Sequence, residues 1–257
     1  MAFDLNNFVI DRIVRGVALS QKDDSVLFSI NQIQNASLNC ASESTDAVDA
    51  MGTPIATFYR AKSAEFSAEN ALFDMNLMAT QLGTSKKVAS AASKVLTPAM
   101  ESFEVEEGLK YELKHAPKGE VKEIYALNSD STFGTKYTKA TAASATEFSI
   151  AGKTISLPTG LEVGTEMFVM YEYESENAVE VVNSAKNFPV GCKFVMEVLG
   201  CDVCDQTNLV YAYVIFNNAK LSPDFDWSIA TDGTHPFSMK AQQDYCDKEK
   251  RLELIAA

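Results

Sequence analysis

Residues 55–83, IATFYRAKSAEFSAENALFDMNLMATQLG, decide the predicted fold, because their apolar side chains first alternate and then recur at helical spacing. The alternation predicts a strand over residues 55–62. The second part predicts a helix over residues 67–83, with Ser67 as its N-cap and Gly83 just beyond its C-terminus. A strand followed by one strong helix indicates a mixed segment of an otherwise β-rich chain.

The helix is predicted to carry a broad apolar surface. Four residues share one buried stripe at i, i+3, i+7 and i+10: Leu72, Met75, Ala79 and Leu82. Phe73, Leu77 and Met78 widen the stripe beyond what a helix with one solvent-facing side needs. We therefore expect a sheet, and also a neighbouring chain, to cover this helix.

Alternation before and after this segment predicts further strands. Residues 26–40 read as one long strand with a bulge near Asn31 and Gln32, and residues 41–54 read as a small, acidic loop. Residues 85–96 are predicted as a weaker helix or a linker. Beyond residue 183, long apolar strands form a hairpin across residues 204–207. Open edges of such strands favour aggregation unless another chain covers them, and the next copy of the protein is the simplest cover.

The middle of the chain has a different pattern of apolar residues and turns. Residues 103–182 contain short alternating segments with regular turn signals, which is typical of a small immunoglobulin-like sandwich, and residues 128–146 are predicted to be a long loop. The sequence therefore predicts an inserted domain at 103–182 within a discontinuous domain made of 1–102 and 183–257.

Composition excludes several classes of protein. The 257 residues carry 22 Lys and Arg against 35 Asp and Glu, a net charge of −13, which disfavours surfaces that grip nucleic acid or anionic lipid. No window approaches the ~20 apolar residues of a membrane span, and no secretory signal is visible, so we expect a soluble chain made in the cytosol. Two histidines and no common catalytic motif predict a protein that is not an enzyme and needs no cofactor.

Five cysteines leave three readings open. Cys201 and Cys204 form a C-x-x-C pair that Cys246 could extend into a zinc site, with Cys40 or His235 as a further ligand. The alternatives are a disulfide and plain reduced thiols, and the thiols are favoured in a cytosolic protein.

Two other features read more simply as structure than as sites. The acidic runs around Glu104 and Glu174 repeat every second residue, so they indicate a solvated strand face more than a cation site or glycosidase carboxylates. Trp227, beside Asp224 and Asp226, could stack on a sugar, but a lone Trp is more often part of a core.

Several stretches together resemble one known family. These are STDAVDAMGTPIATFYRAKSAEFSAENA at 44–71, AKLSP at 219–223 and TDGTHPFSM at 231–239. They are similar to the tail tube (major tail) proteins of tailed bacteriophages, here with an inserted immunoglobulin-like domain.

The resemblance implies a mainly β, tail-tube-like antiparallel sandwich or barrel with one flanking helix. It also implies a structural virion protein whose rings, typically hexameric, stack into a tube that conducts DNA during ejection. The chain would assemble in the host cytoplasm with itself and with other tail proteins, without membrane contact, and DNA would pass through the lumen without specific binding.

The resemblance also assigns roles to residues. Contact between subunits or rings is expected from the acidic segment with Glu43, Asp46 and Asp49, from strand residues Phe58 and Tyr59, and from helix residues Leu72 and Met75. The acidic segment could instead line the lumen, where carboxylates would repel DNA. Competing interpretations are a tail terminator, a connector or decoration protein, an adhesion or carbohydrate-binding module and, third, a zinc enzyme.

Overall fold

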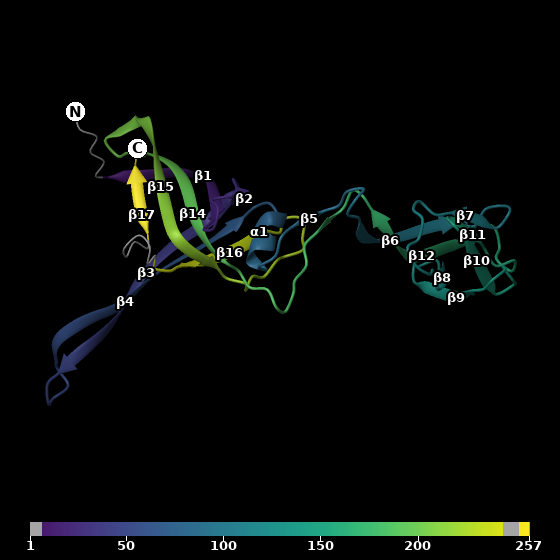
Figure 1. Ribbon diagram of the computed structural model, residues 1–257, viewed down its shortest axis with the longest axis horizontal. Helices are drawn as coiled ribbons and strands as arrows, with labels where there is room; N and C mark the ends of the chain where they lie inside the picture. Colours follow the sequence, from purple (N-terminus) through teal and green to yellow (C-terminus); the bar gives the residue numbers. More distant parts are fainter. Residues whose placement is uncertain (1–6, 244–251, 257) are drawn as a thin grey trace. The chain divides into compact units, whose positions relative to one another are not determined.

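Strands make up most of the chain in the structure, a computed structural model that describes residues 7–243 and 252–256. Two compact units are formed, one by Met1–Lys86 with Val181–Ala257 and the other by Lys87–Glu180 (Figure 1). Within the described ranges, the one helix is α1 (Met75–Gln81). The predicted fold class, mainly β and antiparallel with a single flanking helix, is confirmed.

A curled sheet of eight strands forms the first unit. Its main path runs β2-β1-β14-β15-β16-β4-β3, and β17 also pairs with β15. The bounds are β1 (Phe8–Ser20), β2 (Val26–Ile30), β3 (Ile33–Val48), β4 (Pro54–Asn70), β14 (Gly191–Asp202), β15 (Asp205–Leu221), β16 (His235–Ala241) and β17 (Glu253–Ala256). The predicted hairpin after residue 183 is confirmed as β14–β15, with its turn one residue earlier than expected, at Val203 and Cys204.

Alternation along these strands builds the core of the first unit. Every second residue of β14, from Cys192 to Val198, is buried, as a strand with one face on a core requires. Five phenylalanines from five strands meet there, with ring centroids 5.7–6.3 Å apart: Phe28, Phe66, Phe194, Phe216 and Phe237. Tilted and edge-on aromatic contacts at this spacing stabilise the core that one face of the sheet covers.

The helix prediction was wrong at its N-terminal end. Residues 67–70 continue β4, where Phe66 and Ala68 are buried and pair with β16. The sheet therefore overrides local helix propensity. The helix begins at Met75, and the side chain of Asp74, not Ser67, accepts hydrogen bonds from the amides of Asn76 and Leu77.

The predicted end of the helix is confirmed. Gly83 adopts φ +66°, its amide bonds to the carbonyl of Thr80, and the Thr84 amide bonds to that of Ala79. This pair of hydrogen bonds is a Schellman motif. A Cβ on Gly83 would also lie 2.2 Å from the carbonyl oxygen of Phe188, so the position needs glycine for both φ and space.

Two other local predictions were wrong, and a third was wrong in part. The expected bulge near Asn31 is a break between β2 and β3, which pair with different strands. The expected loop at 41–54 is mostly strand. The sequence did not predict this strand, because both of its faces lie in solvent and no alternating apolar pattern marks it. Of the two alternatives for residues 85–96, the helix was wrong; the boundary between the two units falls in this segment, which contains β5 (Lys87–Val88) and the start of β6 (Val95–Glu104).

The second unit is a small sandwich closed around its own core. Its seven strands follow the order β6-β12-β8-β9-β10-β11-β7, and β5 pairs with β13 where the chain enters and leaves. The bounds are β6 (Val95–Glu104), β7 (Lys110–Glu112), β8 (Glu123–Leu127), β9 (Phe133–Lys139), β10 (Glu147–Ala151), β11 (Thr154–Ser156), β12 (Glu166–Ser175) and β13 (Val179–Glu180). β10 and β11 form a hairpin within the predicted run of short strands, whereas the loop expected at 128–146 contains β9.

The second unit begins at Lys87, ahead of the boundary expected at 103. The reason is β6, whose residues 95–104 pair with β12 along their whole length. Residues 87–102 therefore fold with the inserted part of the chain.

Candidate assembly surfaces

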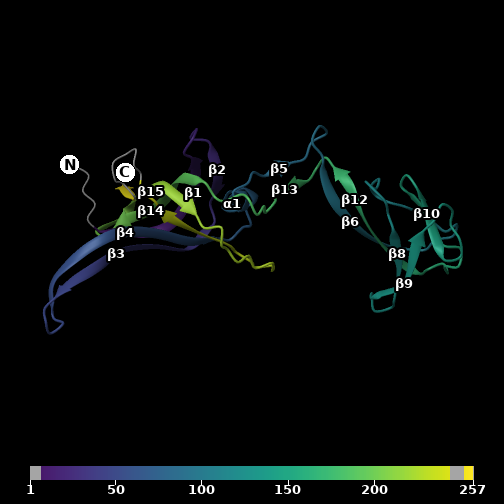
Figure 2. The same cartoon turned by 60° about the horizontal axis from the view of Figure 1, so that its bottom comes forward.

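The β3–β4 hairpin extends well beyond the sheet that holds its base. β16 pairs with β4 only at residues 65–70, and from there the two strands continue as a ribbon of their own (Figures 1 and 2). We call residues 41–63 the arm. At ~3.4 Å per residue it extends about 25 Å. All of its residues are exposed, and no other strand of the described chain pairs with either of its edges.

The tip of the arm is a tight, well-bonded turn. The Asp49 carboxylate accepts hydrogen bonds from the amides of Met51, at 2.8 Å, and Thr53, at 2.9 Å, while Gly52 adopts φ +82°. The Thr53 and Met51 amides lower the pKa of Asp49, so the side chain stays ionised. Asp49 therefore has a structural role in shaping the tip.

Cross-strand pairs define the two faces of the arm. Asp46 lies opposite Thr57 and accepts a hydrogen bond from its hydroxyl at 2.7 Å. Tyr59 shares that face by alternation. Glu43 lies opposite Arg60 on the other face, which it shares with Phe58.

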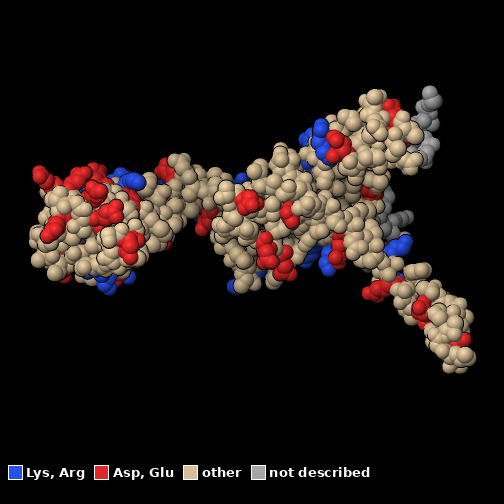
Figure 3. Space-filling model, turned by 180° about the vertical axis from the view of Figure 1, so that it is seen from behind, with Lys and Arg blue, Asp and Glu red and all other residues tan. Residues whose placement is uncertain are grey.

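Large apolar side chains lie on this arm without cover. Tyr59 is 72% exposed and Phe58 is 55% exposed, and both Ile55 and Met51 are exposed as well. Figure 3 shows Asp and Glu side chains scattered along the projecting ribbon, and the arm also carries Arg60 and Lys62. The structure thus brings the predicted residues Glu43, Asp46, Asp49, Phe58 and Tyr59 together on one projecting element, as an apolar ribbon with acidic side chains.

The predicted helix residues lie elsewhere. Leu72 is exposed and precedes α1, so its assignment to a helical stripe was wrong. Met75, at the first position of α1, is half-buried. The side of α1 that faces the core instead carries Leu77, Ala79, Thr80 and Gln81.

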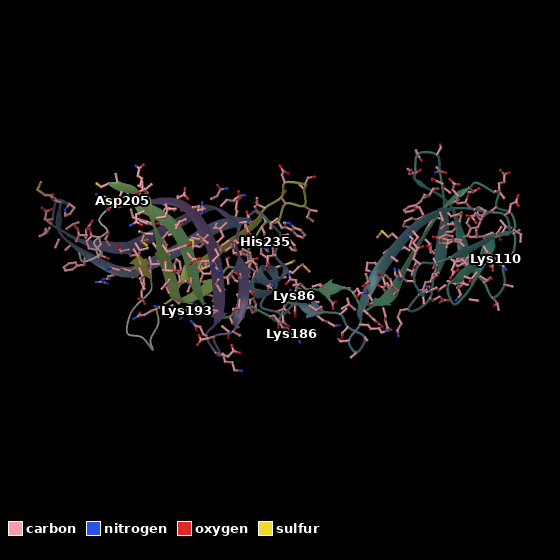
Figure 4. All side chains as sticks on the ribbon, turned by 90° about the horizontal axis from the view of Figure 1, so that it is seen from above. Lys86, Lys110, Lys186, Lys193, Asp205 and His235 are labelled. Atoms are coloured by element: carbon pink, nitrogen blue, oxygen red, sulfur yellow. The ribbon has the colours of Figure 1, made fainter. Side chains whose placement is uncertain are left out.

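A buried histidine, named from the sequence only as a possible further zinc ligand, fixes α1 to the sheet. His235 of β16 is labelled in Figure 4 beside the helix; its Nδ1 accepts a hydrogen bond from the Asp74 amide at 3.3 Å, and its Nε2 lies 2.9 Å from Gln81 Oε1. Because Nδ1 accepts, Nε2 carries the hydrogen, so the ring is neutral. Burial lowers the pKa of His235, although the Asp74 carboxylate opposes this change. The signal in the sequence was the placement of a rare histidine at the start of an apolar strand.

Trp227 belongs to the same region as this histidine. Its ring stacks on Phe73 with centroids 4.1 Å apart, and Phe73 in turn stacks on His235. One face of the indole is therefore occupied by the protein, which favours the predicted packing role over a sugar platform.

The cysteines do not converge on a metal site within the described residues. Cys201 and Cys204 lie at the β14–β15 turn, and both are free thiols, as are Cys40 and Cys192. Among residues 7–243 and 252–256, no group of three His, Cys, Asp or Glu side chains could hold a metal ion. Cys246, the third predicted zinc ligand, lies outside the described residues. Burial raises the pKa of Cys192 to about 11, so that thiol remains protonated.

An ion pair marks the face of the first sheet that points away from its core. The Arg15 Nε donates to Glu197 at 2.8 Å across β1 and β14, and the Tyr213 hydroxyl donates to the same carboxylate at 3.2 Å. Arg15 and Glu197 compensate one another in charge, so this cluster does not contribute to the acidic excess of the first unit.

Comparison with known proteins adds one positive finding. The YomU/Tube protein family model matches residues 8–250. No curated protein matches the chain. In the part of the chain that the structure describes, α1 is too short to cross a membrane.

Proposed function

The chain belongs to the YomU/Tube protein family, a phage tube-type family, and from this membership we propose that its copies close into hexameric rings that stack into a tail tube. Membership implies a structural component of the virion tail that assembles with other tail proteins. We further propose that assembly takes place in the host cytoplasm, that DNA passes along the lumen at ejection, and that the protein is not an enzyme.

The arm is the observation that carries this proposal. A two-stranded ribbon is at best marginally stable in water. This one also holds Tyr59, Phe58 and Ile55 in solvent and leaves both edges open. A second copy of the chain would cover these side chains and pair with the open edges, which is the usual way in which such edges are kept from aggregating.

We propose that the arm forms the contact between successive rings. Its reach of about 25 Å beyond the sheet suits a contact with another layer of subunits. Asp49 and Asp46 shape the hairpin through the Met51, Thr53 and Thr57 hydrogen bonds, so their first role is to keep the arm straight and its tip closed. Phe58 and Tyr59 then supply the apolar contact.

Charge supports passage of DNA without binding. The chain carries 35 acidic against 22 basic side chains, so a ring of several copies is strongly negative. Such a lumen repels phosphate, whereas a basic lining would hold DNA through counterion release.

Electron microscopy of the purified chain tests this proposal. We expect wild-type protein to form rings and tubes, and a Phe58→Ser, Tyr59→Ser variant to form rings that do not stack. Val163→Ser is the control, since Val163 is exposed to a similar extent, 64%, but lies in a turn of the second unit. Tubes of normal length from the arm variant would contradict the stacking role, and a monodisperse monomer from wild type would contradict the tube.

A substitution at Glu43 distinguishes a role of this residue in ring stacking from a role in lining the lumen. Its carboxylate makes none of the turn hydrogen bonds, so Glu43→Gln removes the charge with little effect on the hairpin, whereas Lys would place a like charge opposite Arg60. Poor assembly would support the stacking contact, whereas normal tubes with slowed DNA ejection would place the residue at the lumen.

A further inference from the structure

The outward face of one sheet of the second unit is unexpectedly apolar. In a sandwich, side chains alternate between the core and solvent, and the solvent side is normally polar. On β6 and β12, however, Met100 lies directly opposite Met170. The Met100 side chain is 65% exposed, and Met170 is also exposed.

Aromatic rings extend this surface onto β8 and β9. Phe168 pairs with Tyr125 across β12 and β8. Phe133 of β9 lies 5.0 Å from the Tyr125 ring and 5.1 Å from the Phe168 ring, between centroids, and is itself largely exposed. We define the outer patch by the side chains that form this continuous surface: Met100, Tyr125, Phe133, Phe168 and Met170.

Carboxylates border the outer patch at both ends. Glu104 lies directly opposite Glu166 on the same face, and both side chains are exposed. Like charges in this position destabilise a strand pair, and neither residue has an ion pair with the described part of the chain. Glu172 lies at the other end. A cationic neighbour would relieve the repulsion between Glu104 and Glu166.

We propose that the outer patch docks a partner protein whose contact surface is apolar at its centre and bears Lys or Arg at its rim. Large apolar and aromatic side chains adjoin one another on this face, and contiguous exposed apolar side chains mark interaction sites. Complementary charge at a rim steers association and fixes orientation. A second copy of this chain fits poorly. The second unit carries 15 acidic against 9 basic side chains, and the first unit is acidic as well. Figure 3 shows acidic side chains prominent on one face of this unit. This surface is separate from the arm and does not depend on tube formation.

Binding of synthetic helical peptides to the full chain tests the proposal. The probe is an amphipathic peptide with a leucine face and a lysine face, and its matched control has glutamate in place of lysine. We expect the lysine peptide to bind more tightly than the glutamate peptide. A Met100→Ser, Met170→Ser variant should weaken binding about tenfold, as loss of central apolar contacts does at interfaces.

Two further variants separate this surface from general attraction to an acidic protein. Glu104→Gln with Glu166→Gln removes the rim charge without touching the apolar centre, and it should also weaken the lysine peptide. Phe58→Ser, on the arm, should leave binding unchanged. Far-ultraviolet circular dichroism verifies that each variant is folded.

Each result decides for or against the surface. Equal binding of the two peptides, or an effect of Phe58→Ser as large as that of the methionine variant, would overturn the proposal. Concentration-dependent self-association that disappears in the methionine variant would also overturn it, because the occupant would then be a second copy. Weaker lysine-peptide binding in the methionine variant and in the glutamate variant, but not in the control variant, would support the proposal, whether or not the chain forms tubes.

Discussion

The second unit and the arm use similar side chains with opposite outcomes. In the second unit, strands alternate so that Phe148, Ile155 and Met167 are removed from water within the unit itself. In the arm, Phe58 and Tyr59 stand on strands of equally regular pairing and remain in solvent. Strand pairing alone therefore does not bury a side chain; a second layer is needed, and the arm has none within its own chain.

A buried polar network shows how complete the second unit is. The Glu101 carboxylate accepts hydrogen bonds from the hydroxyls of Tyr171 and Tyr111, the latter at 2.8 Å, and from the Lys114 amide at 3.2 Å. Burial alone would raise the pKa of Glu101, but these bonds outweigh it and the pKa is lowered. Burial and the same carboxylate raise the pKa of Tyr171 to about 12. The hydrogen-bond donors to the Glu101 carboxylate therefore all come from the second unit itself, and no partner chain is needed to supply them.

The largest effect is predicted for a substitution that removes an aromatic ring from the core of the second unit. Phe148→Ala should lower the free energy of unfolding of the second unit by about 3–5 kcal/mol, since it leaves a cavity in a packed interior. Urea unfolding followed by tyrosine fluorescence measures this. A loss no greater than that of a surface substitution would contradict the closed description of this unit.

A smaller effect is expected from Glu101→Gln, which keeps the shape but weakens the hydrogen bonds of the network, at a cost of about 2 kcal/mol. Because the folded pKa of Glu101 is lowered, the stabilisation is present above its unfolded pKa and is lost as the pH falls through the folded pKa. The difference between wild type and variant in chemical unfolding should therefore shrink in acid. Glu112→Gln, at an exposed site, is the control, and equal effects of the two would argue against the network.

His235 should give the first unit a pH dependence of its own, smaller again. Its folded pKa is lowered, so the unfolded chain takes up the proton first and stability falls as the pH drops through the unfolded value of about 6.5. The midpoint temperature of thermal unfolding should fall more steeply for wild type than for His235→Gln as the pH is lowered from neutral to about 5. Parallel curves would show that the histidine does not titrate with unfolding.

The smallest effect on folding is expected in the arm. Phe58→Ala should change the free energy of unfolding of the unassembled chain by no more than about 0.5 kcal/mol, because the ring is already in solvent. The same substitution should reduce assembly measured by sedimentation. A large loss of monomer stability would mean that the arm packs against its own chain.

Sequence reasoning found the architecture from the residues that alternate over a core. The β14–β15 hairpin, the β10–β11 hairpin and the helix end at Gly83 all carry local signals, and the family resemblance agrees with the match over residues 8–250. It failed where the decisive contact is distant. Ser67 looks like an N-cap until β16 pairs with its strand.

The candidate surface shows the same division. Asp46, Asp49, Phe58 and Tyr59 were predicted as contact residues, and the structure places all four on one hairpin. The segment before Pro54 was expected to be a loop, because a strand exposed on both faces leaves no alternating pattern to read. The packing role of His235 and the outer patch were not anticipated, because each depends on residues far apart in the sequence.

Amide hydrogen exchange of the arm, in the dissociated chain and in assembled particles, tests the central claim that a second copy completes it. We expect residues 41–63 to exchange rapidly in the dissociated chain and slowly after assembly, while the Phe148 region is protected in both states. Rapid exchange of the arm in both states, or slow exchange of the arm in the dissociated chain, would contradict the account.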